Sequence, residues 1–224
     1  MSSSRLHRRL SSMLDSDNPA AFHSMRDFMA QLEEDADLTR IRAEVNPRLE
    51  ITEICQRTLN IDGPALLFEN PSGSNGVPLL GNLFGSSRRV AAAIGLKHTR
   101  DLRRFGEQLA FLNAPELPPG LTDALDKLPR FGRLKHVNPR TVDTPACREV
   151  VLEKDEIDLS NWPIQTCWPE DAGPLITFGL VITRGPHKKR QNIGIYRQQV
   201  IGRNQVIMRW LHHRGGAIDF REWQ

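Results

Sequence analysis

The segment at residues 192–216 constrains the fold more than any other part of this 224-residue chain. Its sequence, NIGIYRQQVIGRNQVIMRWLHHRGG, contains two runs rich in β-branched or aromatic residues, at positions 194–200 and 206–212. Between the runs, Gly202-Arg203-Asn204 includes residue types that adopt the positive φ values of a tight reversal. The segment therefore predicts a β-hairpin, and with it antiparallel strands near the carboxyl end.

Arginine side chains make this hairpin a candidate anion site. If the strands pair symmetrically about Arg203, Arg197 and Arg209 lie directly opposite each other on one face. Like charges that face each other destabilise a strand pair, so this arrangement favours an anion between them, and a phosphate is the obvious candidate. A register shifted by one residue would instead place the two guanidinium groups on opposite faces. On residue type alone, both arginines could equally be solvated or paired with Glu170 or Asp171.

The chain before residue 114 alternates between helical and strand-like patterns. Ser24 and Asp27 have a spacing close to that of a capping box, and Phe28 and Leu32 then fall on one helix face. The predicted strands are residues 38–45, 65–68 and 77–80, and the further predicted helices are residues 49–59, 88–94 and 99–112. Helices that alternate with short apolar strands predict an α/β domain over residues 24–113.

Proline residues separate this domain from a second region of different character. Because repeated prolines oppose long regular elements, residues 114–148 are predicted to form a linker with one short helix at 121–128. Strand-like runs then appear at 149–152 and 175–183 and continue into the hairpin. We therefore predict a β-rich second domain over residues 149–224 and an α+β fold for the chain.

Composition narrows the function classes. With 39% hydrophobic and 25% charged residues the chain is typical of globular proteins, and no apolar run approaches the roughly 18 residues of a membrane span. Three widely spaced cysteines without C-x-x-C spacing argue against a disulfide framework or a zinc site and favour a reducing cytoplasm. The net charge is only +3, and the basic cluster at 184–190 lacks aromatic residues that would stack on bases. This favours a solvated turn over nucleic-acid binding.

The first 23 residues allow two interpretations. Residues 2–14 are rich in Ser and Arg and contain no acidic residue, which is the composition of a transit peptide. The same composition fits a poorly ordered extension, which is our prediction for residues 1–23.

Two long stretches carry a resemblance to a known family. Residues 167–192, CWPEDAGPLITFGLVITRGPHKKRQN, and residues 193–220, IGIYRQQVIGRNQVIMRWLHHRGGAIDF, closely resemble the UbiD family of prenylated-flavin-dependent decarboxylases. The resemblance begins near Met25, includes LEITEICQRTL and IDGPALLFENPSG, and continues to Gln224. It implies an amino-terminal α/β domain followed by part of a split β-barrel of the flavin-reductase type. Family members are longer and this chain ends without a terminal signal of its own, so we expect an amino-terminal half.

An activity is implied as well. The resemblance predicts non-oxidative decarboxylation of 4-hydroxy-3-polyprenylbenzoate to 2-polyprenylphenol in ubiquinone biosynthesis, with prenylated FMN and a divalent metal ion. Loss of CO₂ from an aromatic acid leaves a carbanion, and side chains cannot supply the electron sink that it needs. The carboxylate that completes the metal site and the proton donor are expected beyond Gln224. The alternatives are a non-catalytic flavin-phosphate-binding or oligomerisation module and an oxidoreductase built on the same barrel.

The same resemblance implies residue roles, position by position. Asn192 and His213 match the metal ligands, and an amide oxygen with an imidazole suits Mn²⁺ or Mg²⁺ better than zinc. Arg197 matches a residue that assists the chemistry. The positions that match cofactor-binding residues are Thr177, Ile195, Tyr196, Arg197, Arg209, Trp210, Leu211, Arg214 and Gly215. His212 departs from the family pattern, which leaves open whether His212 or His213 is the ligand.

Partners and location also follow from the resemblance. We expect a prenylated aromatic acid as substrate, a flavin prenyltransferase as supplier of the cofactor, other copies of the chain in a homo-oligomer, and a cytoplasmic location with transient contact to a membrane surface. Trp162 and Trp168 could line a substrate pocket or hold a loop against the core. Cys167 is interpreted as a buried thiol rather than a nucleophile, since no base is evident nearby.

Overall fold

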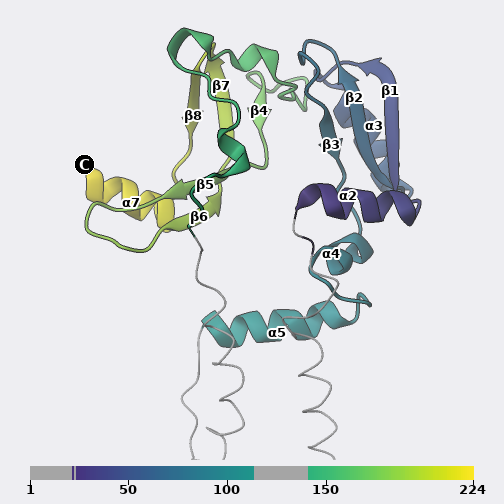
Figure 1. Cartoon of the computed structure of the whole chain (residues 1–224), viewed down its shortest axis with the longest axis horizontal. Coiled ribbons are helices and arrows are strands. Elements are labelled where there is room, and N and C mark those ends of the chain that lie inside the picture. Colours follow the sequence, from purple (N-terminus) through teal and green to yellow (C-terminus); the bar gives the residue numbers. More distant parts are fainter. Residues whose placement is uncertain (1–21, 23, 114–140) are drawn as a thin grey trace, which may run out of the picture.

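The computed structural model describes residue 22, residues 24–113 and residues 141–224 (Figure 1). The predicted extension, except Phe22, and the predicted helix at 121–128 lie outside these residues. The helices described are α2 (Met25–Glu34), α3 (Glu50–Asn60), α4 (Ser87–Ala93), α5 (Asp101–Asn113) and α7 (Gly215–Trp223), with short 3₁₀ helices η2 (Ala146–Arg148), η3 (Lys154–Glu156) and η4 (Leu159–Asn161). The strands are β1 (Leu38–Val45), β2 (Ala65–Pro71), β3 (Leu79–Gly81), β4 (Leu175–Ile176), β5 (Leu180–Thr183), β6 (Asn192–Ile195), β7 (Gln198–Gly202) and β8 (Gln205–Met208).

A three-stranded sheet in the order β1-β2-β3 forms the centre of the amino-terminal part. β1 and β2 are parallel, with Leu38 opposite Ala65, and α3 is the crossover between them. β3 pairs antiparallel with β2, so that Leu80 lies opposite Leu67. The helices and strands expected in this part are confirmed, with bounds that differ by at most three residues. Ser24 caps α2 as predicted, because its hydroxyl accepts a hydrogen bond from the backbone N–H of Asp27.

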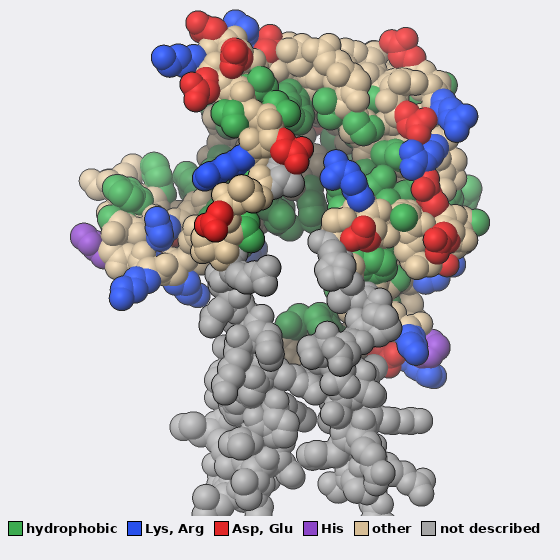
Figure 2. Space-filling model, viewed as in Figure 1, with side chains coloured by type: hydrophobic (Ala, Val, Ile, Leu, Met, Phe, Trp, Pro, Cys, Tyr) green, Lys and Arg blue, Asp and Glu red, His purple; other side chains and the backbone are tan. Residues whose placement is uncertain are grey.

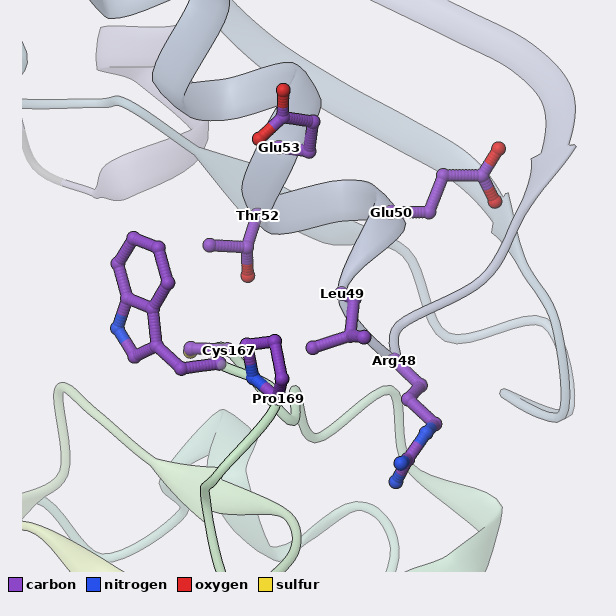
Figure 3. Close-up of a pocket in the computed structure, with 8 residues that line it drawn as sticks. Arg48, Leu49, Glu50, Thr52, Glu53, Cys167 and Pro169 are labelled. Atoms are coloured by element: carbon purple, nitrogen blue, oxygen red, sulfur yellow. The ribbon is translucent and has the colours of Figure 1, made fainter.

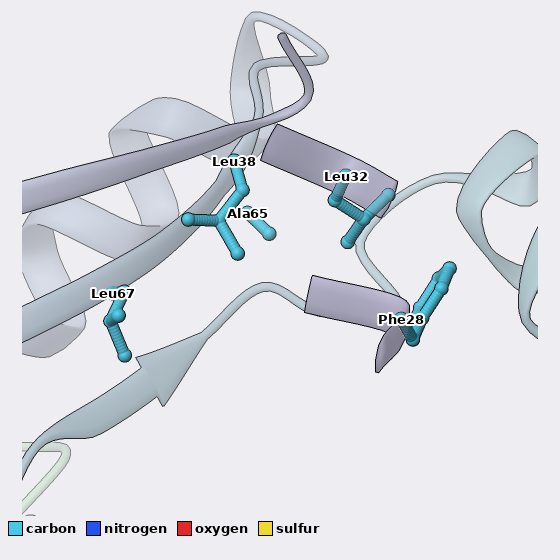
Figure 4. Close-up of a cluster of buried hydrophobic side chains, with 5 residues drawn as sticks. All are labelled: Phe28, Leu32, Leu38, Ala65 and Leu67. Carbon is cyan, nitrogen blue, oxygen red and sulfur yellow. The ribbon is translucent and has the colours of Figure 1, made fainter. Parts of the chain in front are cut away.

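Successive residues of β2 enter two hydrophobic clusters, because side chains alternate between the faces of a strand. The cluster that includes α2 consists of Phe28, Leu32, Leu38, Ala65 and Leu67 (Figure 4). The cluster that includes α3 consists of Val45, Ile51, Leu66 and Phe68. The four-residue apolar run in β2 is therefore covered on both faces, which is typical of a strand in a parallel sheet.

A buried ion pair connects α4 to the start of β1. Arg89 is 1% exposed, and its Nη1 donates to Asp37 Oδ1 at 2.7 Å and to the carbonyl oxygen of Gly63 at 3.1 Å. Arg88 approaches the second oxygen of Asp37 at 3.0 Å from the surface, where its side chain is 70% exposed. Desolvation makes an unpaired buried charge costly, so Asp37 and Arg89 have to be buried together.

Two small antiparallel sheets and α7 form the carboxyl-terminal part. One sheet has the order β4-β7-β8 and the other contains β5 and β6. A two-stranded sheet is marginally stable by itself, and α7 packs against both β5 and β6 (Figure 1). The chain is thus a mixed α+β structure whose second part is rich in short strands.

Pairing in the predicted hairpin is symmetric about Arg203 over most of its length. Gln198 lies opposite Met208 and Val200 opposite Val206, while the register shifts between Val200 and Gly202 before the turn. Continued by one residue, the same register would place Arg197 opposite Arg209, but strand pairing ends at Gln198 and Met208. The turn and the register are confirmed, and the two arginines flank the last pair.

Several strands predicted in this part are wrong in extent. The run at 194–200 is divided at Tyr196 and Arg197, where the chain leaves β5 and joins β4. Tyr196 is buried there and binds the first turn of α7, which explains why the strand is interrupted. The run at 175–183 is broken between Ile176 and Leu180, and the run at 206–212 stops at Met208. Residues 149–152 form no strand.

The two parts meet where the start of α3 contacts the loop before β4. Arg48 forms an isolated parallel bridge with Thr166, and the backbone N–H of Leu49 donates to the Thr166 carbonyl at 2.9 Å. Gln165 Nε2 donates to Thr52 Oγ1 at 3.4 Å. These contacts join segments more than a hundred residues apart in sequence.

Charged side chains of both signs are scattered over the face shown in Figure 2. In contrast, one face of the β5–β6 sheet exposes apolar side chains, because Leu180 lies opposite Ile195 and Ile182 opposite Ile193. These four residues are 54–66% exposed. Among the helices described, none is long and apolar enough to pass through a membrane.

Candidate functional site

The predicted site residues lie between β4 and the first turn of α7. Thr177 is exposed between β4 and β5, and Asn192 is the half-buried first residue of β6. Ile195 ends β6, and Tyr196 and Arg197 follow it. Arg209, Trp210, Leu211, His213 and Arg214 lie between β8 and α7, and Gly215 opens α7. Of these residues, Asn192, Tyr196 and Trp210 lie against the first turn of α7.

Asn192 lies directly against the start of α7. A Cβ atom built on Gly215 would come within 2.2 Å of Asn192 Oδ1, so only glycine leaves room for the amide at this position. Arg214 immediately precedes the helix as its N-cap residue and makes no side-chain capping bond. The amino-terminal end of a helix carries unpaired N–H groups and a partial positive charge, which together favour an anion.

Two aromatic side chains contact Gly216, the second residue of α7. Tyr196 Oη accepts a hydrogen bond from the backbone N–H of Gly216 at 2.8 Å. Trp210 packs edge-on against Tyr196 with ring centroids 5.2 Å apart and stacks on Phe220 at 5.7 Å. This aromatic cluster thus holds three segments together: the residues that follow β6, the residues that follow β8, and α7.

A polar network that the sequence did not reveal lies next to Asn192. Asn192 Nδ2 donates to Thr183 Oγ1 at 3.1 Å, and the Thr183 hydroxyl donates to Asp219 Oδ2 at 2.7 Å. Lys188 Nζ lies 2.9 Å from Asp219 Oδ1 and 2.7 Å from Glu222 Oε1. The basic turn at 184–190 was predicted to be solvated, but Lys188 is tied to α7. No sequence signal identifies the bonds from Thr183 and Lys188 to α7, because they join residues more than 30 positions apart along the chain.

Asp219 is held as a carboxylate within this network. The side-chain hydrogen bond from Lys188 and then that from Thr183 lower the pKa of Asp219, while burial works in the opposite direction. Hydrogen bonds from Asp219 first and Glu222 second raise the pKa of Lys188. Both groups are therefore charged at neutral pH.

The arginines of the hairpin remain accessible. Arg197 and Arg209 are exposed, and neither forms an ion pair with another of the residues described. The suggested pairing with Asp171 is not found. Its carboxylate instead accepts the backbone N–H groups of Cys167 at 3.1 Å and Trp168 at 2.9 Å and so closes a local turn.

His212 and His213 are exposed neighbours, with ring centroids 5.3 Å apart in an edge-on arrangement. Among the described residues, no three His, Cys, Asp or Glu side chains gather into a metal-binding group. Asn192 does fit one position around a hard cation, because its amide nitrogen is bound to Thr183 and no described residue donates a hydrogen bond to its oxygen. An imidazole from this pair would supply a second ligand.

A cavity of about 500 Å³ lies elsewhere, between the start of α3 and the loop before β4 (Figure 3). Its lining residues are Arg48, Leu49, Glu50, Thr52, Glu53, Cys167, Trp168 and Pro169. None of the predicted cofactor or metal positions is among them. Trp168 therefore lines a cavity between α3 and the loop before β4. Burial raises the pKa of the Cys55 thiol to about 11, and Cys167 adds to that effect.

Two family models match the chain in separate segments. One, described as the 3-octaprenyl-4-hydroxybenzoate carboxy-lyase N-terminal domain, matches residues 29–109. The other, described as the 3-octaprenyl-4-hydroxybenzoate carboxy-lyase Rift-related domain, matches residues 140–224. The chain belongs to the UbiD family. The site residues described above all lie in the Rift-related segment of this UbiD chain.

Solved UbiD-class structures resemble this chain over most of its length. HmfF from Pelotomaculum thermopropionicum in complex with FMN is 30% identical with a TM-score of 0.66, and the match covers 84% of this chain and 37% of HmfF. An evolved dimeric form of HmfF in complex with prFMN is 28% identical, with a TM-score of 0.62 and coverage of 85% and 39%. Vanillic acid decarboxylase from Sedimentibacter hydroxybenzoicus in its closed form is 25% identical, with a TM-score of 0.70 and coverage of 90% and 40%. The chain thus spans about two fifths of these relatives.

Proposed function

We propose that this chain supplies the flavin- and metal-binding portion of a prenylated-FMN-dependent decarboxylase. The observation that carries the proposal is the convergence of Asn192, Tyr196 and Trp210 on the amino-terminal end of α7, within the segment that matches the UbiD Rift-related domain. The flavin complexes of HmfF support the cofactor. We further propose 4-hydroxy-3-polyprenylbenzoate, a precursor in ubiquinone biosynthesis, as the substrate, because the matching family models are described by that chemistry.

We assign binding of the cofactor phosphate to the three arginines of this site. Arg197, Arg209 and Arg214 are exposed, and Arg214 directly precedes the backbone N–H groups of the first turn of α7. Guanidinium groups and a helix amino terminus both favour a phosphate dianion. Thr177, Ile195, Tyr196, Trp210, Leu211 and Gly215 complete the proposed cofactor set.

A divalent cation, Mn²⁺ or Mg²⁺, is assigned to the Asn192 amide oxygen and the His213 imidazole, with His212 as the alternative imidazole. Its charge would offset that of the cofactor phosphate. A further oxygen ligand is needed, since a hard cation takes about six ligands. Asp219 does not serve, because both of its oxygens are already bonded to Thr183 and Lys188.

In the proposed decarboxylation, prenylated flavin and the side chains of the protein have different roles. Prenylated flavin, when bound, supplies the electron sink for the carbanion left by loss of CO₂. Arg197 would assist the chemistry by pairing with carboxylates of the complete protein. The aromatic side chains of Tyr196 and Trp210 exclude water from the inner side of the site.

At the level of the whole chain, we propose that residues 24–113 and 149–224 are separate domains joined by residues 114–148. Their sheets share no strand in the described part of the chain, and the two family models match them separately. Strands β4 to β8 are proposed to belong to a split β-barrel of the flavin-reductase type. A homo-oligomer is also proposed, and the evolved dimeric HmfF supports it.

The test uses the purified chain loaded with prenylated FMN and Mn²⁺. Addition of 4-hydroxy-3-prenylbenzoate should perturb the absorption spectrum of the bound flavin at lower concentration than vanillate or 3,4-dihydroxybenzoate, and CO₂ release is measured in the same samples. A preference for vanillate would overturn the proposed substrate. Oxidation of a nicotinamide by the loaded chain would favour the oxidoreductase alternative. Flavin binding that no aromatic acid perturbs would favour a non-catalytic binding or oligomerisation module.

A further inference from the structure

The amide of Asn192 is placed opposite a hydroxyl on the neighbouring strand. Thr183 ends β5 and pairs with Asn192, the first residue of β6, in the antiparallel register. Asn192 Nδ2 lies 3.1 Å from Thr183 Oγ1. An asparagine amide can turn over and exchange its oxygen and nitrogen, and a hydroxyl can either donate or accept. The pair alone therefore does not decide which end of the amide faces α7.

Asp219 removes this ambiguity. An ionised carboxylate can only accept hydrogen bonds, so the single Thr183 hydroxyl proton must be directed at Asp219 Oδ2, 2.7 Å away. Thr183 Oγ1 can then only accept from Asn192, which must present its NH₂ group to the hydroxyl. The Asn192 amide oxygen is consequently directed to the other side, where it lies against Gly215 at the start of α7.

Lys188 keeps the direction of the chain of hydrogen bonds fixed. Asp219 is almost fully buried, and its second oxygen is bound by Lys188 Nζ at 2.9 Å. A protonated Asp219 could donate to Thr183 and thereby allow the hydroxyl to donate to Asn192 instead. The cation at Lys188 opposes this protonation. Asp219, on α7, therefore controls the orientation of an amide on β6 although the two side chains are not in contact.

We propose that Thr183 and Asp219 are positioning residues that present the amide oxygen of Asn192 to a divalent cation at the amino-terminal end of α7. This inference rests on the proposed role of Asn192 as a metal ligand. Outer partners that orient a ligand typically contribute about 10- to 100-fold to metal affinity. The ligand oxygen must be presented before the cation binds, so the effect belongs to metal affinity and does not require a loaded, active enzyme.

The experiment measures Mn²⁺ affinity of the full chain from the free-Mn²⁺ signal in electron paramagnetic resonance. Thr183→Val removes the hydroxyl with little change in shape, and Thr183→Ser restores it. Asp219→Asn supplies an amide NH₂ that can donate to Thr183 and so reverse the hydrogen bonds. We expect the Kd to rise about 10-fold or more for Thr183→Val and Asp219→Asn and to change less than about twofold for Thr183→Ser.

Glu222→Gln is the matched control, because it removes the other partner of Lys188 and leaves the bonds among Asp219, Thr183 and Asn192 in place. Thermal unfolding in EDTA and with Mn²⁺ separates a positioning role from a structural one. At one fixed Mn²⁺ concentration, the increase in Tm caused by Mn²⁺ should be unchanged in Glu222→Gln and smaller in Thr183→Val and Asp219→Asn.

The outcomes distinguish this inference from the proposed function. If Asn192→Ala abolishes Mn²⁺ binding while Thr183→Val and Asp219→Asn bind as the unmodified chain does, the metal site stands and the positioning role is wrong. If Asn192→Ala binds Mn²⁺ as the unmodified chain does, or if the unmodified chain binds none, the metal assignment is wrong and the positioning role fails with it.

Discussion

At the scale of single residues, Gly216 is packed too closely against two aromatic side chains to accept an added atom. A Cβ built there would lie 2.4 Å from the ring of Trp210 and 2.7 Å from Tyr196 Oη. We expect Gly216→Ala to lower the free energy of unfolding by about 1–3 kcal/mol, as overpacking usually does. Urea unfolding measures this value.

Gly106→Ala provides the control in the same experiment. Gly106 lies inside α5, and a Cβ there would meet no atom within 4 Å. Alanine is the better helix former, so this variant should gain about 0.5–1 kcal/mol. Equal effects of the two substitutions would contradict the packing described around the first turn of α7.

At the scale of elements, Arg88 and Arg89 of α4 both contact Asp37 before β1, but we expect them to contribute unequally to the free energy of unfolding. Arg89→Met removes the buried partner of Asp37 and should lower the free energy of unfolding by about 2–3 kcal/mol, somewhat less than a full buried-pair loss because Arg88 still faces Asp37. Arg88→Ala removes a largely exposed partner and should cost less than about 1 kcal/mol. Denaturant unfolding of both variants compares them, and a larger loss for Arg88→Ala would contradict the assignment.

The attachment of α7 to β5 should depend on pH. The pKa of Asp219 is lowered from 3.8, so its contribution is present above that value and is lost as the pH falls through the lower folded-state pKa. The Tm difference between the unmodified chain and Asp219→Asn should therefore be constant above about pH 5 and shrink below about pH 4. Circular dichroism melts at several pH values test this. Asp62→Asn, at an exposed residue of the amino-terminal part, should show no such convergence.

Elements in the amino-terminal part could be predicted because local patterns determine them. The capping serine before α2 and the apolar run in β2 are local signals, and both correspond to elements in the structure. The carboxyl-terminal strands were predicted too long, since their breaks depend on long-range contacts such as the one between Tyr196 and Gly216. The bonds from Thr183 and Lys188 to Asp219 could not be predicted either, because they also join residues far apart in the sequence. In the site, the hairpin register could be predicted, whereas the orientation of Asn192 could not.

At the scale of the whole molecule, we expect the exposed apolar face of β5 and β6 to promote self-association. Ile182 and Ile193 lie opposite each other and are 60% and 64% exposed. Exposed apolar strands promote association, so the chain should self-associate in sedimentation velocity experiments. Ile193→Lys should shift the distribution toward monomer, whereas Ile61→Lys, at an even more exposed residue of the amino-terminal part, should not. A sharp monomer peak for the unmodified chain would contradict this prediction.

The cofactor-binding site that we propose for this UbiD chain lies at the hairpin and the first turn of α7. The most direct test is titration of prenylated FMN into the Mn²⁺-loaded chain by isothermal calorimetry, with Arg197→Ala and the nearby exposed Arg190→Ala compared. We predict saturable binding that weakens about 10-fold or more in Arg197→Ala, because a charge-assisted bond contributes roughly 1.5–3 kcal/mol, and that is unchanged in Arg190→Ala. Absence of binding, or equal loss in both variants, would mean that the cofactor does not bind at this site.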